Sequence, residues 1–586
     1  MNKIARLITL LLSFTFFTSA YSQGFLKASG KQIVNEKGEN VLLRGIGLGG
    51  WMVQEGYMLK LQGNNPQFSI RKKIAQLLSP EQTQEFYDTW LSNHTTKADI
   101  DSLHAWGFNS VRLPMHYNLY TLSSEQETEA GKQTWLTKGF ALTDSLLNWC
   151  KANNMYLILD LHAAPGGQGN DINIADRDTT KPSLWQSEAN KNKTIALWKK
   201  LAERYKDEPY IGAYDILNET NWGFDDSVND KHGLKEEHNK PLRELLMHIT
   251  EAIRSVDKKH IVIIEGNGWG NNYRGVFPMW DDNMVISFHK YWNFNDTKSI
   301  QHILDTREKY NIPVWLGETG ENSNVWFADA VRLFESNNIG WSWWPLKKIG
   351  INNPLEIKSN LNYNRLVNYW NGKAARPPKE SDVYSGLLEL ATYSNIRSNI
   401  VHRDVIDAMF RQPFNNNAIA FKPNIISSKD SIIEAVDYDL GRNGIAYSDK
   451  DTGNYYISTG GKRNAGNKGG LYRNDGVDIY KDSAHYEKYY VGDIEDGEWV
   501  QYTIDVRESG SYLLKLNVSA NSNAEISVYI DDKIAKEKAI VHSTTSLKNF
   551  QSQLINTITL NEGKHVVRIN FIKGGFHFKQ LILTKK

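Results

Sequence analysis

"AYDILNET" (Ala213–Thr220) begins like a buried β-strand and then places an amide and a carboxylate, Asn218 and Glu219, at its end. The pattern recurs in "VWLGETG" (Val314–Gly320), another short apolar run that leads into a glutamate, Glu318. Burying a carboxylate without a partner is costly. Two strands that end in this way therefore indicate that their ends form the floor of a cleft rather than part of a core.

Six further β-rich runs accompany these two, and most are followed by a helical pattern. In "ALWKKLAERY", for example, Leu197, Leu201 and Tyr205 fall on one helical stripe. Near-continuous apolar strands that alternate with helices indicate a parallel sheet covered by helices, and eight such units predict an α/β fold of the (β/α)8 TIM-barrel type. The eight runs span 40–50, 108–115, 155–162, 211–219, 260–269, 284–292, 312–320 and 339–347.

A doubly wound open sheet is the alternative fold. It requires a glycine-rich phosphate loop between its first strand and a helix. "GIGLGGW" (45–51) is superficially similar, but it lacks the G-x-G-x-x-G spacing and "MVQEGYMLK" follows it instead of a helix. The barrel is therefore favoured.

The sequence pattern changes after the predicted barrel. From Ile432 onwards, short alternating runs such as "EWVQYTIDV" and "HVVRINFI" are separated by Gly, Asn and Asp turns, which predicts an antiparallel β-sandwich of the jelly-roll type. We therefore expect a catalytic barrel over 23–424, a linker over 425–431 and a β-sandwich over 432–586.

Composition excludes several classes of protein. The 586 residues are 40% hydrophobic and carry a net charge of +1, so there is no electrostatic footprint for nucleic acid. Lys3 and Arg6 precede an apolar run over 8–17, which predicts a signal peptide over 1–22 and a secreted protein, either extracellular or periplasmic. No later run reaches the ~18 apolar residues of a membrane span. Cys150 is the one cysteine, so no intramolecular disulfide is possible, and we expect a monomer.

Polar side chains end six of the predicted strands. In a barrel of this type the active site is built from the carboxyl ends of the strands, so these side chains should meet in one place. The set consists of Arg112, His162, Asn218, Glu219, His289, Tyr291, Glu318 and Trp344. Its two carboxylates suggest hydrolysis of a glycosidic bond, in which one carboxyl group donates a proton and the other attacks or activates water.

"DILNETNW" and "VWLGETG" together resemble glycoside hydrolase family 5, the retaining β-glycosidases on (β/α)8 barrels. The resemblance implies that Glu219 is the acid/base and Glu318 the nucleophile, with Asn218 bound to the sugar 2-hydroxyl. It also implies that Arg112 orients the nucleophile and keeps it ionised, and that Tyr291 lies near it. The remaining matched residues are His162, His289 and the platform tryptophan Trp344, with Trp343 as the alternative.

Within that family, "RGIGLGGWMVQEGYM" and "DLHAAPGGQ" resemble the exo-β-1,3-glucanases and their β-1,6-glucan relatives. The match implies that Glu55 binds the sugar at the −1 subsite. We therefore expect a β-glucan substrate, with β-1,3-glucan first and β-1,6-glucan, β-1,4-glucan and mannan as alternatives, and no cofactor for catalysis.

The C-terminal region resembles carbohydrate-binding module family 6, through "YDLGRNGIAYSDKDTGN", "GLYRNDGVDIY" and "VGDIEDGEWVQYTI". The match implies that Tyr447 is an aromatic ligand residue. Three positions depart from the pattern: Asp493 replaces a tryptophan, His577 an asparagine and Val436 an acid. Glycan binding at the usual site and a structural calcium both stay open for that reason.

Two other functions remain as alternatives. A non-catalytic glycan-binding protein would retain glycan without turnover, although the presence of both carboxylates argues against it. A metal-dependent hydrolase would use Asp160, His162 and His289, and chelators would inhibit it. Such sites usually carry His-x-His on the first strand, and "RGIGLGG" has none.

Overall fold

The computed structural model of this chain describes residues 24–586 except 292, 428, 451–467, 484 and 486–487. The signal peptide predicted over 1–22 lies outside the described residues, so it and secretion stay predictions. Among the helices that are described, none combines the length and apolar character needed to cross a lipid bilayer.

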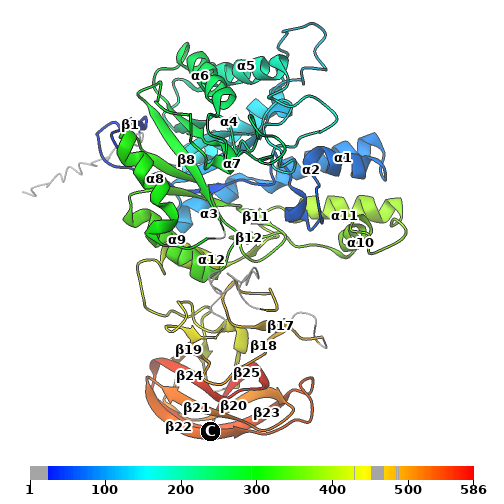
Figure 1. The fold of residues 1–586 in the computed structure, drawn as a ribbon. Coiled ribbons are helices and arrows are strands. Elements are labelled where there is room, and N and C mark those ends of the chain that lie inside the picture. The colour runs from blue at the N-terminus through cyan, green and yellow to red at the C-terminus, as the bar shows by residue number, and fades with distance from the viewer. Residues whose placement is uncertain (1–23, 292, 428, 451–467, 484, 486–487) are drawn as a thin grey trace, which may run out of the picture.

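Eight parallel strands close into a barrel in the order β10-β3-β4-β5-β6-β7-β8-β9 (Figure 1). Closure occurs where β10 pairs with β3, with Trp341 opposite Arg44 and Trp343 opposite Ile46. A doubly wound sheet would have left these two strands unpaired, so the barrel prediction is confirmed. The strands are β3 (Arg44–Gly47), β4 (Ser110–His116), β5 (Tyr156–Ala163), β6 (Ile211–Asp215), β7 (Ile261–Glu265), β8 (Met284–Lys290), β9 (Val314–Gly320) and β10 (Gly340–Trp344).

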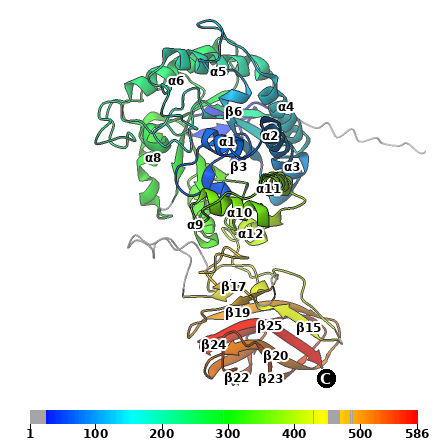
Figure 2. The same ribbon diagram turned by 90° about the vertical axis from the view of Figure 1, so that its right-hand side faces the viewer.

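Helices surround the barrel (Figure 2). Local sequence sets their ends: Ser79 caps α2 through a capping box with Gln82, and Pro80 occupies the first turn. The stripe of Leu197 and Leu201 in α5 is fully buried, as the spacing predicts. The helices are α1 (Gln67–Ala75), α2 (Pro80–His94), α3 (Lys97–Trp106), α4 (Thr137–Ala152), α5 (Glu188–Tyr205), α6 (Lys240–Arg254), α7 (Asn267–Gly270), α8 (Thr297–Tyr310) and α9 (Asn324–Ser336), followed by α10 (Leu361–Trp370), α11 (Glu380–Tyr393) and α12 (Arg403–Phe410).

The amino-terminal end of the barrel is closed by apolar packing. Ile158, Ala213 and Ile263 belong to a buried cluster with Leu26, which precedes the hairpin of β1 (Lys27–Ser29) and β2 (Gln32–Val34). Side chains alternate between the two faces of a strand. The neighbours of these residues along the strands, such as Leu157 and Val262, therefore point outwards and pack against the helices. An active site can therefore form only at the carboxyl end of the barrel.

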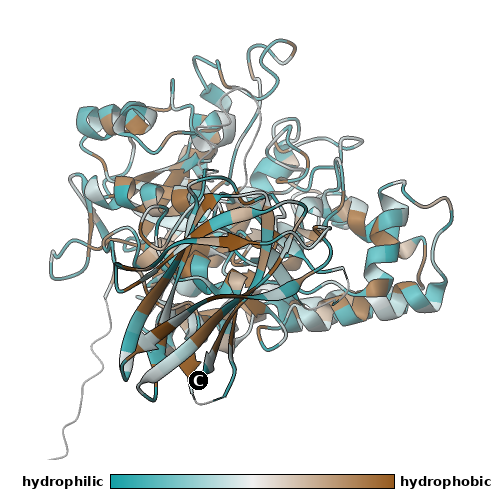
Figure 3. Ribbon diagram, turned by 90° about the horizontal axis from the view of Figure 1, so that it is seen from below, coloured by the Kyte–Doolittle hydropathy of each residue, from teal (hydrophilic) through white to brown (hydrophobic). Residues whose placement is uncertain are grey.

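The C-terminal region is a sandwich of two six-stranded sheets, as predicted. Apolar and polar residues alternate along its strands (Figure 3). One sheet contains β14 (Ile425–Ile426), β16 (Tyr447–Ser448), β19 (Trp499–Val506), β21 (Ala524–Ile530), β22 (Lys533–Val541) and β24 (Gly563–Lys573). The other contains β15 (Ser431–Glu434), β17 (Ile479–Lys481), β18 (Tyr489–Val491), β20 (Gly510–Ala520), β23 (Gln551–Leu560) and β25 (Phe576–Lys585).

The boundary between the two domains differs from the predicted linker over 425–431. Ile425 and Ile426 form β14, which pairs with β19, and Ile419 already bridges to Leu440. The sandwich therefore begins several residues before the expected linker. Short strand segments of this kind carry too few residues for an alternating pattern, which is why the sequence did not reveal them.

Candidate active site

The inward-facing side chains of the barrel strands change from apolar to polar towards the carboxyl ends. On β5 the inward series runs from Ile158 to Asp160 and His162, and on β7 it runs from Ile263 to Glu265. All of these residues are buried. The strands thus deliver charged groups to one end of an otherwise apolar interior.

Strand β9 brings Glu318 into the site by a break in this alternation. Strict alternation from Trp315 would turn residue 317 inwards and Glu318 outwards. The register between β8 and β9 shifts between Phe288 and His289, so that Glu318 pairs with His289. A bulge of this kind re-aims a side chain at the rim of a barrel. Gly317 suits the position because a Cβ there would lie 2.3 Å from the hydroxyl of Ser287.

Arg112 lies at the centre of the site and is fully buried. Its guanidinium forms an ion pair with Glu318, lies 3.2 Å from Asp160 and donates to Asp215 at 2.9 Å. It also donates to Asn218 at 2.8 Å and to Glu265 at 3.1 Å. Burial opposes its charge, but the surrounding carboxylates raise the pKa of Arg112 well above its ordinary value. A charge-assisted donor in this position orients the carboxylate of Glu318.

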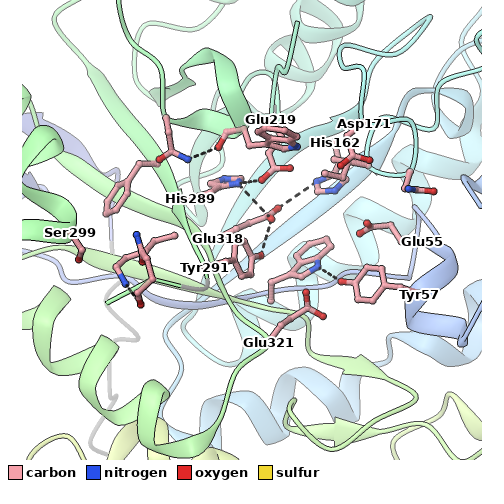
Figure 4. A pocket seen from close by; sticks show the side chains of 18 of the residues that line it. Glu55, Tyr57, His162, Asp171, Glu219, His289, Tyr291, Ser299, Glu318 and Glu321 are labelled. Carbon is pink, nitrogen blue, oxygen red and sulfur yellow. Dashed lines mark hydrogen bonds and ion pairs between the residues drawn. The ribbon is translucent and has the colours of Figure 1, made fainter. Parts of the chain in front are cut away.

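Glu219 and Glu318 face each other across the site (Figure 4). The facing ligand atoms of Glu219, His289 and Glu318 all lie within 4.8 Å of one another. The two glutamates line a cavity of about 700 Å³ at the carboxyl end of the barrel. The structure therefore brings the two predicted carboxylates together in an accessible pocket.

The surroundings of Glu219 favour its protonated form. The side chain is 5% exposed, and its backbone lies in the left-handed region at φ 39°. Burial, reinforced by the charges of Glu318 and Glu265, raises the pKa of Glu219 even though His289 opposes the rise. The Nδ1 atom of His289 lies 2.6 Å from Glu219 Oε1. A neutral carboxyl group next to an ionised one is the combination that proton donation requires.

His289 links the carboxylates to one another. Its Nε2 atom lies 3.1 Å from Glu265, and its Nδ1 atom lies 3.6 Å from Glu318. Burial favours the neutral imidazole, but the carboxylates of Glu265, Glu318 and Glu219 raise the pKa of His289 well above its ordinary value. Burial opposes the charge of Glu265 as well, but His289, Arg112 and the backbone N–H of Glu219 together lower the pKa of Glu265 to about 2.

Aromatic and acidic residues form the walls of the cavity. Trp344 stacks on His162 with ring centroids 5.1 Å apart, and its indole N–H donates to the hydroxyl of Tyr57 at 3.1 Å. Tyr291 donates to Glu318 at 3.2 Å. Burial and the charge of Glu318 raise the pKa of Glu55, which also lines the cavity. Trp343, the alternative platform, is buried behind this wall and is absent from it.

One predicted residue offers a free hydrogen-bond donor in the site. Asn218 is fully buried, its carbonyl oxygen accepts from Arg112, and its Nδ2 atom has no protein partner. A buried donor of this kind is costly unless a ligand or water satisfies it. The sequence does not single out Asp215 or Glu265 as site residues, although both continue an inward series by the two-residue period. Tyr57 lies in a short 3-10 helix (Gly56–Leu59), and Asp171 and Glu321 lie on loops, so no strand pattern could mark these three cavity residues.

Tyr447 does not reach the surface of the sandwich. Its ring is 1% exposed and packs edge-on against Tyr438, with centroids 5.3 Å apart. A covered ring cannot stack on a sugar, so its assignment as a ligand residue is wrong for this structure. A half-exposed aromatic run lies elsewhere: Tyr490 stacks on Tyr480 and on His577 at 5.8 Å and 4.7 Å, and Phe550 lies 5.3 Å from Tyr490.

Comparison with known protein families agrees with this geometry. Residues 72–349 match the family described as "Cellulase (glycosyl hydrolase family 5)". The barrel is a glycosyl hydrolase family 5 domain. Residues 471–585 match the "Carbohydrate binding module (family 6)", so the chain joins a glycoside hydrolase to a carbohydrate-binding module.

Curated relatives of this glycoside hydrolase carry the names of different glycosidases. A "Beta-xylosidase" of Phanerodontia chrysosporium is 26% identical over 58% of this chain and 75% of its own length. "Endoglucanase C" of Acetivibrio thermocellus is 26% identical over 39% of this chain and 58% of its own. A "Probable glucan 1,3-beta-glucosidase A" of Aspergillus clavatus is 25% identical over 44% of this chain and 58% of its own. The substrate therefore has to be argued separately from the family.

The residues that the sequence offers as metal ligands, in the barrel and in the module, have other partners in the structure. In the barrel, Arg112 supplies the positive charge beside Asp160 and Glu318, the place a cation would take. In the carbohydrate-binding module, the carboxylate of Glu434 accepts from Lys488 at 2.6 Å, and Val436 offers no ligand atom. One oxygen of Glu434 is thus engaged by Lys488, while its Oε2 atom has no hydrogen-bond partner among the described residues, so a structural calcium in the module stays a prediction.

Proposed function

We propose that the barrel hydrolyses β-glucan with retention of the anomeric configuration, through Glu318 as nucleophile and Glu219 as acid/base. The observation that carries the proposal is the separation of the two carboxylates, whose facing oxygens lie within 4.8 Å in an open cavity. Retaining glycosidases hold their carboxyl groups about 5–5.5 Å apart, whereas inverting enzymes need roughly 6.5–9.5 Å to admit water.

The first step breaks the glycosidic bond. Glu219, whose pKa is raised, donates its proton to the leaving oxygen, while the Glu318 carboxylate attacks the anomeric carbon and forms a covalent glycosyl-enzyme. Arg112 and Tyr291 hold Glu318 by hydrogen bonds on its two oxygens, which fixes the attacking atom. The leaving sugar departs with the proton as its new hydroxyl group.

The second step returns the enzyme to its starting state. Glu219, now ionised, takes a proton from a water molecule, and the resulting hydroxide displaces Glu318 from the anomeric carbon. Two displacements at one carbon restore the original configuration. The imidazolium of His289, 2.6 Å away, stabilises Glu219 while it carries a charge between the two steps.

β-1,3-Glucan is the first substrate to test, because the "RGIGLGGWMVQEGYM" stretch resembles exo-β-1,3-glucanases and a relative is named a glucan 1,3-beta-glucosidase. A β-xylosidase activity is the second candidate, because the relative of that name matches over the longest stretch among those given above. We propose that the aromatic run of Tyr480, Tyr490, Phe550 and His577 provides the glycan-contacting surface of the module, because flat rings suit sugar faces.

The test is a substrate panel with products followed over time. It contains laminarin, pustulan, carboxymethylcellulose, glucomannan, xylan and aryl β-glucoside and β-xyloside. Release of glucose from laminarin with a first-formed β-anomer supports the proposal, and early products of one sugar unit indicate attack at chain ends. A first-formed α-anomer would refute retention, and binding of glycan without turnover would favour the non-catalytic alternative. Loss of activity in Glu318→Gln, with folding intact, assigns the turnover to this site.

A further inference from the structure

We propose that Asn474 of the carbohydrate-binding module is a positioning residue for the catalytic barrel, because it holds the loop that follows the nucleophile strand. This loop carries Glu321 into the wall of the cavity. The inference rests on the proposed role of Glu318, and it makes the module part of the catalytic unit rather than a tethered accessory.

Asn474 makes four hydrogen bonds to the barrel domain. Its backbone carbonyl accepts from the N–H of Asn324 at 3.0 Å, and its backbone N–H donates to Asp404 at 2.8 Å. Its side-chain amide donates to the carbonyl of Asn322 at 2.7 Å and to the Asn324 side chain at 3.2 Å. One residue of the module therefore fixes both the backbone and a side chain of 322–324.

These contacts are shielded from water. Asn322, Asn324, Asp404 and Asn474 are each 1% exposed. A polar group buried at this depth has no water to replace a lost partner, so removing one hydrogen bond leaves its partner unsatisfied. Inter-domain interfaces ordinarily permit relative motion of the domains.

Further polar contacts hold the module side of the contact in place. Arg473 forms an ion pair with Asp475 at 2.6 Å, and its guanidinium lies 3.7 Å from the ring centroid of Tyr438. Asp475 accepts from the side-chain amide of Asn324 at 2.9 Å. The same Asn324 amide donates to Asp404 at 2.8 Å, so carboxylates from both domains hold one side chain between them.

The position of this contact in the chain gives it consequences for the site. Strand β9 ends at Gly320, and the next residue, Glu321, lines the cavity with its backbone at φ 52°. Glu321 forms an ion pair with Lys348 (Figure 4 shows Glu321 at the cavity wall). Asn322 follows immediately, and its carbonyl is the one that Asn474 holds. A shift of 322–324 would therefore move Glu321 and the end of the strand that carries Glu318.

The arrangement of the domains agrees with this assignment. The module lies beside α9 and α12 in both views of the molecule (Figures 1 and 2). Helix α9 begins at Asn324, directly after the loop, and α12 carries Asp404. The contact is thus made at the same end of β9 as the cavity.

The test compares Asn474→Ala with Asn556→Ala in the full-length protein. Asn556 is a matched control, because its amide makes one hydrogen bond within the module, to the carbonyl of Ala535 at 2.8 Å. Two quantities are measured: kcat and KM on the aryl β-glycoside that the wild type turns over, and hydrogen–deuterium exchange of the segment 319–327. The small substrate removes any need for polysaccharide binding by the module.

We expect Asn474→Ala to lower kcat by roughly tenfold or more with little change in KM, and to speed exchange in 319–327. Asn556→Ala should change neither quantity. An unchanged kcat or an unchanged exchange rate in Asn474→Ala overturns the inference, even if its melting temperature falls. If Asn474→Ala does not fold, Asn474→Ser replaces it. The exchange measurement does not depend on turnover. If the wild type turns over no substrate, the proposed function fails. If exchange in 319–327 is unchanged in Asn474→Ala, the positioning role of Asn474 fails.

Discussion

Replacing Glu219 with alanine should separate the two halves of the reaction. The change removes the buried carboxyl group that donates the first proton, and general acid catalysis of this kind contributes roughly 10²–10⁴-fold. At 5% exposure, solvent cannot readily supply the proton instead. We therefore expect the upper part of that range on polysaccharide, a loss of about 4–5 kcal/mol of transition-state stabilisation.

The size of the loss depends on the leaving group. A dinitrophenyl glycoside needs no proton for its departure, so glycosylation of Glu318 should proceed and the glycosyl-enzyme should accumulate in Glu219→Ala. Hydrolysis then becomes slow, because no base activates water. A burst of dinitrophenol followed by a slow steady state, measured by stopped flow, is the expected result.

Azide should rescue this second step. The substitution vacates the space of a carboxylate next to the Nδ1 atom of His289, which lies 2.6 Å from the lost oxygen and attracts an anion. Azide attacking from that side should give the β-glycosyl azide, identified by NMR. Formation of the α-azide would refute the assignment of Glu219 and Glu318 to opposite faces of the sugar, and near-wild-type hydrolysis of polysaccharide would refute the role of Glu219 altogether.

Four further outcomes are expected. His289→Gln removes the cation that opposes the rise in the pKa of Glu219, so the pKa rises further and the basic limb of kcat/KM moves to higher pH; an unmoved or lower limb would contradict this. Tyr291→Phe removes the 3.2 Å hydrogen bond to Glu318 and should cost about tenfold in kcat/KM, measured on the aryl glycoside. Tyr490→Ala should weaken retention on insoluble β-glucan roughly tenfold in pull-down assays, and unchanged retention would exclude the aromatic run as the contact surface. Dialysis against a chelator should leave the melting temperature unchanged, and a fall would show that the module binds a structural cation.

Much of the barrel could be predicted because its signals are local. Apolar runs of strand length that alternate with helical stripes specify both the element type and the covered sheet, and strand ends are polar only where a site needs them. The same two-residue period would have identified Glu265, which follows Ile261 and Ile263 on the inward face of β7. It could not identify Glu318 as inward-facing, since the bulge opposite His289 reverses the alternation there.

What the sequence could not show depends on contacts between distant segments. Tyr447 resembles a ligand residue in its local motif, and only packing against Tyr438 reveals that its ring is covered. Asn474 lies in an ordinary turn-like stretch, and its importance follows from Asn322 and Asp404, which reach it from two separate parts of the barrel domain. Neither secondary-structure propensity nor hydrophobic periodicity reports contacts between residues that are distant in the sequence.

The shared polar contact between the domains also limits how the two could be recombined. A foreign module fused after α12 would bring no counterpart of Asn474 or Asp475, and would leave Asp404 and Asn324 facing an unmatched surface. Replacing the module would therefore also disturb the barrel that is kept, because the loop after β9 would lose the hydrogen bond that Asn474 donates to Asn322.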